Sequence, residues 1–110
     1  MASSAELLAL LRDRLNRSEL EWRRTRLPPP TRANPLPDPD AVRLARMLEE
    51  CGRKIDRIAG QLRTRPADAA TENTVQTHLA FLVSLTETGM PDAEPLFASL
   101  RHLETLLADR

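Results

Sequence analysis

The residue types that most often carry chemistry are few and scattered in this sequence. Cys51 is the single cysteine, and His78 and His102 are the two histidines. Nucleophilic catalysis by cysteine needs an exposed thiolate beside a histidine base. Cys51 instead falls in an apolar row of a predicted helix, where a small buried hydrophobic side chain fits. We therefore expect Cys51 in the core and predict no catalytic residue.

The sequence also lacks the spacings that bind metal ions. Neither His78 nor His102 has a His, Cys, Asp or Glu three or four residues away, as a helical metal site requires. One cysteine excludes an intrachain disulfide, a cysteine-based zinc site and an iron–sulfur cluster. The two histidines could meet across neighbouring helices, but we expect ordinary surface or boundary positions for both. The sequence predicts no metal site and no cofactor.

Carboxylates and glycines form no catalytic or phosphate-cradling pattern. Adjacent residues such as Glu49 and Glu50 point about 100° apart on a helix, so they do not share one site. With three isolated glycines, the chain has neither G-x-x-x-x-G-K-[ST] nor G-x-G-x-x-G. An enzyme is therefore disfavoured, and we expect no small-molecule substrate.

Basic side chains recur along one face of the second predicted helix, about 200° around that helix from its apolar face. This basic row, with its flanking and trailing members, consists of Arg43, Arg46, Arg53, Lys54, Arg57, Arg63 and Arg65. Guanidinium groups make bidentate contacts with phosphates, so the row predicts binding to a nucleic-acid backbone without reading of base sequence. The alternative is a solvated face on which Glu49 and Glu50 pair with arginines one turn away.

Charge is balanced over the whole chain but not along it. Residues 1–65 carry 14 Lys and Arg against 9 Asp and Glu, whereas residues 66–110 carry 2 against 7. Either the acidic half faces the basic half of the same chain or of a neighbouring copy, or each half meets an outside partner. A second basic cluster, Arg23, Arg24 and Arg26, ends the first predicted helix, where cations also suit the helix dipole.

Helices must position all of these residues. Aromatic residues make up 3% of the chain and glycine is scarce, a composition that favours helices over a β-sandwich or barrel. The first helix opens at Ser3 or Ser4, and Ser3 has capping-box spacing with Glu6. Ser18 and Glu21 have the same spacing, which leaves open a break near residue 16.

A proline-rich segment separates this helix from the rest of the chain. Residues 28–39 hold six of the nine prolines, a density that no helix or central strand tolerates. In extended form the segment reaches about 37 Å, more than the about 34 Å of the first helix. The first helix is therefore free to pack elsewhere, even on another chain. We divide the chain into an N-terminal helical segment (1–27), a linker (28–39) and a helical core (40–110), and we expect the core to stay folded after cleavage of the linker.

The second helix, with Asp40 as predicted N-cap and Pro66 as its limit, has the most regular apolar pattern. Its apolar residues step by three and four over three heptads, as in a coiled-coil seam. This apolar seam consists of Ala41, Leu44, Leu48, Cys51, Ile55, Ile58 and Leu62. The spacing predicts that the seam is a core or an interface.

Two shorter helices follow. One begins between Asp68 and Asn73 and stops at Gly89, and the other follows Asp92 with Pro95 in its first turn. Their apolar stripes are Val75, Leu79, Leu82 and Leu85, then Leu96, Leu100, Leu103 and Leu107. The short connection predicts an antiparallel hairpin. The predicted fold class is all-α, a small bundle of about four helices.

In size, all-helical pattern and basic helix, the chain resembles the small helical subunits of multi-subunit CRISPR effector complexes. The resemblance is one of architecture and rests on no motif. The leading interpretation is a non-catalytic subunit of a larger assembly that contacts a nucleic-acid backbone through the basic row. Other protein subunits are expected partners, and head-to-tail self-association is left open.

The alternative function is a protein-only adaptor or secretion-type chaperone that grips a partner helix through the apolar seam. Neither interpretation involves a membrane. No apolar run approaches the roughly 18 residues of a membrane span, and no basic segment precedes a signal-like apolar stretch. We expect a cytoplasmic protein.

Overall fold

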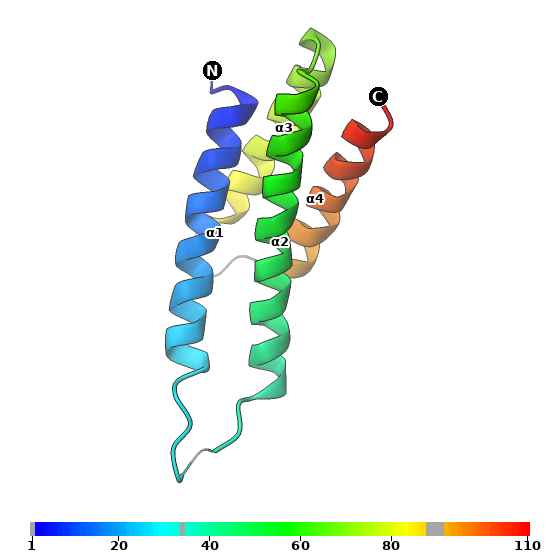
Figure 1. The fold of residues 1–110 in the computed structure, drawn as a ribbon. Coiled ribbons are helices and arrows are strands. Elements are labelled where there is room, and N and C mark those ends of the chain that lie inside the picture. Colours follow the sequence, from blue (N-terminus) through cyan, green and yellow to red (C-terminus); the bar gives the residue numbers. More distant parts are fainter. Residues whose placement is uncertain (1, 34, 88–91) are drawn as a thin grey trace.

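Four helices account for the regular structure of residues 2–33, 35–87 and 92–110, the residues that the computed structural model describes. They are α1 (Ser4–Arg26), α2 (Pro39–Thr64), α3 (Ala69–Leu85) and α4 (Ala93–Ala108) (Figure 1). With extents of 57 × 25 × 20 Å, the molecule is elongated along its helices. The predicted all-α class with four helices is confirmed.

The start of α2 differs from the prediction. Its N-cap is Asp38, whose carboxylate accepts a hydrogen bond from the backbone N–H of Asp40 at 3.0 Å. Pro39 is the first helical residue, a position that tolerates proline because an N–H there has no intrahelical partner. The predicted cap at Asp40 is therefore wrong, and Pro39 belongs to the helix.

The first helix, α1, is continuous. Its N-cap is Ser3, whose hydroxyl accepts a hydrogen bond from the backbone N–H of Glu6 at 3.2 Å, as the first capping pair predicts. The second pair, Ser18 and Glu21, lies inside the helix, so the break near residue 16 does not occur. Leu15 before that point is buried in the core and Trp22 after it packs against the core, and these tertiary contacts override the local capping signal.

The third helix, α3, starts within the predicted range and ends early. Its N-cap Asp68 accepts a hydrogen bond from the backbone N–H of Thr71 at 2.8 Å. The helix ends at Leu85, whereas the predicted stop, Gly89, lies outside the described residues. Contact between α3 and α4 is sparser than between the other neighbouring helices. Their antiparallel hairpin stays a prediction.

The hydrophobic core forms where all four helices overlap. Three α1 residues, Leu8, Leu11 and Leu15, are at most 3% exposed there. The other members of the core are Leu48, Cys51, Ile55, Ile58, Val75, Leu79, Leu82, Val83, Ala93, Leu96, Leu100, Leu103 and Leu107. Because α1 supplies part of this core, it packs on α2 and α3 of its own chain, and the long linker does not carry it elsewhere.

Helix length shapes the rest of the molecule. At 1.5 Å per residue, the 23 and 26 residues of α1 and α2 span about 34 and 39 Å, against about 24 to 26 Å for α3 and α4. In Figure 1, α1 runs toward the linker and α2 returns beside it, and both extend past α3 and α4. We call the linker with the adjoining ends of α1 and α2, residues 22–49, the linker end. Its α2 part borders the start of α4 at Arg43, Leu44 and Met47.

Leu48→Ala should destabilise the protein strongly, because Leu48 is 1% exposed within the core. Loss of a buried leucine leaves a cavity and typically costs about 2–5 kcal/mol in the free energy of unfolding. Chemical denaturation followed by circular dichroism measures this change. Leu20→Ala, at a site that is 70% exposed on α1, is the control and should change stability by less than about 0.5 kcal/mol. Equal effects would contradict the core assignment.

Cleavage of the linker should leave α1 bound to the rest of the chain. Exposed proline-rich backbone without regular structure is a favoured site of proteolysis. Since Leu8, Leu11 and Leu15 fill the common core, the two pieces of the nicked protein should elute together in size-exclusion chromatography. A fragment of residues 40–110 made alone should melt well below the nicked protein. An equally stable fragment would show that the core does not need α1.

Candidate nucleic-acid interface

The basic row is not one continuous charged surface. Arg43 and Arg46, at its N-terminal end, are exposed and make no ion pair within the described part of the chain. Arg53 pairs with both Glu49 and Glu50, one turn away on α2. The middle of the row thus carries the helical ion pairs of a solvated face.

Glu104 of α4 neutralises two further members of the row. Its carboxylate lies 3.1 Å from Nζ of Lys54 and 2.8 Å from Nε of Arg57. The Lys54 side chain is only 11% exposed, and its ammonium lies 4.9 Å from the centre of the Phe97 ring. Lys54 is therefore a packing residue between α2 and α4. At this point the acidic half of the chain faces its own basic half.

The C-terminal members of the row separate from one another. Arg65 donates a hydrogen bond to the backbone carbonyl of Arg110, at the end of the chain. Arg63 lines a groove between α1 and α2. The seven basic side chains therefore have at least three different surroundings.

The apolar seam lies mostly inside the bundle. Leu48, Cys51, Ile55 and Ile58 are at most 2% exposed. Leu44 and Leu62, nearer the two ends of the seam, are partly buried against the same core.

A cleft at the linker end is lined by members of both the basic row and the second basic cluster. It has a volume of about 580 Å³ and lies between the end of α1, the linker and the start of α2. Its walls include Arg23 and Arg26 from α1 and Arg46 from α2. Arg43, one turn before Arg46, borders a smaller depression at the start of α4.

The carboxylates that line this cleft are already engaged. Glu49 pairs with Arg23 at 3.4 Å, and Asp38 caps α2. Arg26 and Arg46 have no carboxylate partner among the described residues. Their positive charge is therefore available to an anion that enters the cleft.

Trp22 fixes the geometry of the linker end. Its indole Nε1 donates a hydrogen bond to the backbone carbonyl of Ala41 at 2.9 Å, which ties α1 to α2. The guanidinium carbon of Arg26 lies 5.1 Å from the ring centre, within the range of a cation–π contact. Sequence reasoning missed this role, because a lone tryptophan before a basic cluster does not indicate which helix it reaches.

The other chemically reactive residues lie apart from the cleft. Cys51 is fully buried, as predicted, and this burial raises the pKa of its thiol to about 11. The rings of His78 and His102 meet across α3 and α4, with centres 5.6 Å apart. His78 is partly buried and His102 is exposed. In residues 2–33, 35–87 and 92–110, no group of three His, Cys, Asp or Glu side chains could hold a metal ion.

Comparisons with protein-family models, curated proteins and solved structures find no match. Function is therefore inferred from the side chains and their contacts alone. Among the described helices, none is long and apolar enough to cross a membrane.

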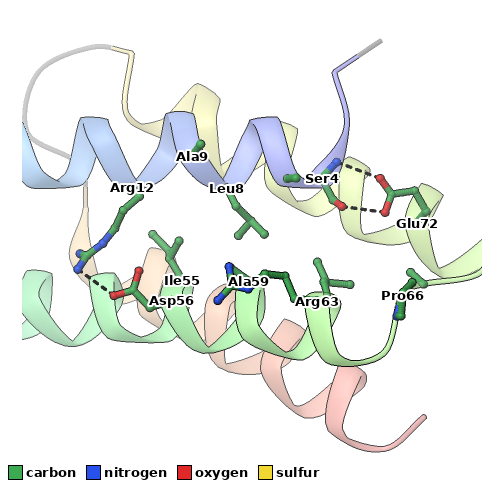
Figure 2. A pocket seen from close by; sticks show the side chains of 13 residues that line it. Ser4, Leu8, Ala9, Arg12, Ile55, Asp56, Ala59, Arg63, Pro66 and Glu72 are labelled. Carbon is green, nitrogen blue, oxygen red and sulfur yellow. Dashed lines mark hydrogen bonds and ion pairs between the residues drawn. The ribbon is translucent and has the colours of Figure 1, made fainter.

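The α1–α2 groove (Figure 2) lies at the end of the molecule opposite the linker, where α1 begins and α2 ends (Figure 1). The backbone N–H and the hydroxyl of Ser4 donate hydrogen bonds to the two carboxylate oxygens of Glu72, at 2.9 and 2.8 Å. This contact ties the start of α1 to α3. Farther along, Nη2 of Arg12 donates to the carboxylate of Asp56 at 3.1 Å, which ties α1 to α2.

Glu72→Gln should lower the melting temperature at neutral pH and flatten its decline in acid. Hydrogen bonds from the backbone and hydroxyl of Ser4 hold the pKa of Glu72 below its ordinary value of 4.5. A carboxylate whose pKa is lower in the folded than in the unfolded state stabilises the fold at pH values above the unfolded-state pKa. This stability is lost as the pH falls through the folded-state pKa. Melting curves from about pH 7 to about pH 3 measure the effect.

Glu94→Gln is the matched control, because Glu94 occupies the first turn of α4 as Glu72 occupies that of α3. It should change the pH dependence less. Equal changes in both variants would attribute the effect to the helix dipole and not to Ser4.

Proposed function

We propose that this protein is a non-catalytic helical subunit that binds the phosphate backbone of a nucleic acid at its linker end. One observation carries the proposal. Arg26 and Arg46 come from two helices to line one cleft, and neither has a carboxylate partner among the described residues. A phosphate accepts paired, charge-assisted hydrogen bonds from a guanidinium, so it is a suitable ligand for both side chains.

This proposal narrows the contact predicted from the basic row. A phosphate near Arg53 or Arg57 would have to displace a carboxylate that already binds there. A phosphate at Arg26 or Arg46 would displace none. Arg43, one turn from Arg46 on α2, lies next to the cleft, in a depression that it shares with Asp92 and Glu94 at the start of α4. It has no ion-pair partner among the described residues and adds a third guanidinium. The proposed interface therefore consists of Arg26, Arg43 and Arg46.

Binding through the backbone suits the aromatic content of the linker end. Proteins that hold unpaired bases stack them on exposed aromatic rings. No aromatic residue is among the described residues that line the cleft, and Trp22, next to Arg26, is engaged with Ala41 and Arg26. We therefore expect affinity with little dependence on base sequence.

Three phosphate contacts suit a subunit that acts within a larger assembly. Other subunits, or further copies bound head to tail along the strand, would each add contacts and raise the overall affinity. As a small helical subunit within a larger assembly, the protein would resemble the small helical subunits of CRISPR effector complexes. The resemblance is one of architecture, without a shared motif.

The alternative function, an adaptor or secretion-type chaperone, uses the apolar seam to hold a partner helix. Leu48, Ile55 and Ile58 are at most 2% exposed and pack against the chain's own helices. A partner helix would have to open the bundle before it could reach them. The free arginines therefore favour nucleic acid, and a protein partner is an outcome of the test below.

The triple variant Arg26→Gln, Arg43→Gln, Arg46→Gln should lose RNA binding and keep its helical fold. Fluorescence anisotropy with labelled single-stranded oligouridine measures the affinity at several salt concentrations. For the unmodified protein, log affinity should fall against log salt with a slope of about −2, because each neutralised phosphate contributes about −0.7 on a single strand. Any affinity that remains in the variant should depend little on salt.

A second triple variant, Arg53→Gln, Arg57→Gln, Arg101→Gln, removes the same charge from other exposed sites and is the matched control. Its RNA affinity should remain near that of the unmodified protein. Equal losses in the two variants would replace a specific interface by a general effect of net charge. If the unmodified protein binds no RNA and the first variant loses a cross-linked protein partner, the adaptor function replaces this proposal.

A further inference from the structure

The α1–α2 groove has no part in the proposed binding of a nucleic-acid backbone, which occurs at the other end of the molecule. We propose that this groove binds a small amphipathic anion, a molecule with one carboxylate or similar head group and an apolar body. The volume of the groove, about 520 Å³, lies within the roughly 300–1,000 Å³ that is typical of small-molecule sites.

The walls of the groove are mostly apolar and small. Leu8 and Ile55 reach it from the core, while Ala5 and Ala9 on α1 and Ala59 on α2 leave the space between the helices open (Figure 2). Ala5 and Ala9 are exposed. An apolar body placed here would remove their methyl groups from water, which favours binding.

Polar contacts mark both ends of the groove and limit the length of its occupant. The Ser4–Glu72 hydrogen bonds lie at one end and the Arg12–Asp56 pair at the other. Along α1 these ends are about 12 Å apart at 1.5 Å per residue. A partner segment that runs along the groove would have to cross one of these contacts, whereas a small molecule would fit between them.

The Arg12 guanidinium passes directly over Gly52 on its way to Asp56. A Cβ atom at Gly52 would overlap Nη1 of Arg12, so any larger residue there would force the flexible end of the Arg12 side chain to move. In a helix interior, glycine is less favourable than alanine by up to about 1 kcal/mol. The close passage of Arg12 offers a physical reason for a glycine at position 52.

The positive charge of Arg63 favours a ligand with a negatively charged head group. The other charged groups of the groove are engaged, Arg12 with Asp56 and Glu72 with Ser4. Arg63 has no carboxylate partner among the described residues, and its side chain lies along α2 on the groove side (Figure 2). An anionic head group would complete the hydrogen bonds of this guanidinium. Sequence patterns gave no sign of the site, since its residues come from three separate segments.

Decanoate, used below its micelle-forming concentration, is a suitable probe. It should raise the melting temperature of the protein in proportion to its occupancy, because it would bind only the folded state. Decyltrimethylammonium has the same chain and the opposite charge, and should not. Isothermal titration calorimetry measures both affinities directly.

Three substitutions locate the binding site. Ala9→Leu fills the groove from an exposed position that the fold tolerates, and Ala59→Leu fills it from the opposite wall; each should abolish decanoate binding. Arg63→Gln should weaken decanoate binding about tenfold, as expected for a lost hydrogen bond to a charged group, and leave decanol binding nearly unchanged. Arg43→Gln removes a distant exposed arginine and should have no effect on decanoate.

The proposal is overturned if both filling variants bind decanoate like the unmodified protein, or if the two head groups bind equally. It is also overturned if Ala9→Leu converts a dimer to a monomer while decanoate has no effect, because a second copy would then cover the groove. Oligouridine affinity should be unchanged in Ala9→Leu. The proposal of an anion site in the groove and the proposal of nucleic-acid binding at the linker end can therefore be refuted independently.

Discussion

The apolar seam of α2 lies between α1 and α4, and the packing of those two helices against it sets the positions of the other parts. Its central side chains, from Leu48 to Ile58, are at most 2% exposed. Full burial of a large aliphatic side chain contributes about 1.5–3 kcal/mol, whereas an exposed ion pair contributes about 0–1 kcal/mol. Packing therefore sets the helix positions, and the ion pairs form where packing happens to bring opposite charges together.

This order of causes explains which charges remain free. The leucines of α4 must lie against α2, and that packing brings Glu104 to Lys54 and Arg57. The longer α1 and α2 extend beyond α3 and α4 (Figure 1), and no described residue of α3 or α4 lines the cleft that holds Arg26 and Arg46. The two proposed sites lie at opposite ends of the α1–α2 pair, one at the linker end and one beside the small side chains Ala5, Ala9 and Ala59.

Local patterns predicted the helices well, since capping and apolar periodicity act over a few residues. Ser3 and Asp92 cap α1 and α4 as their surroundings indicate. The error at the start of α2 is also local. Asp38 and Asp40 are both suitable caps, and the fit of Pro39 at the first helical position decides between them. The break near residue 16 failed for a different reason, because tertiary packing overrode a short-range signal.

The sequence by itself determined the all-α class, the four helices, the burial of Cys51 and the exposure of Arg43, Arg46, Arg53 and Arg57 on α2. The tertiary structure alone decided which arginines are free, that Trp22 bonds to Ala41, and that the α1–α2 groove exists. The physical reason is that periodicity shows which face of a helix is apolar but not which helix covers it. Ion pairs such as Arg57–Glu104, and clefts between helices, depend on that second choice.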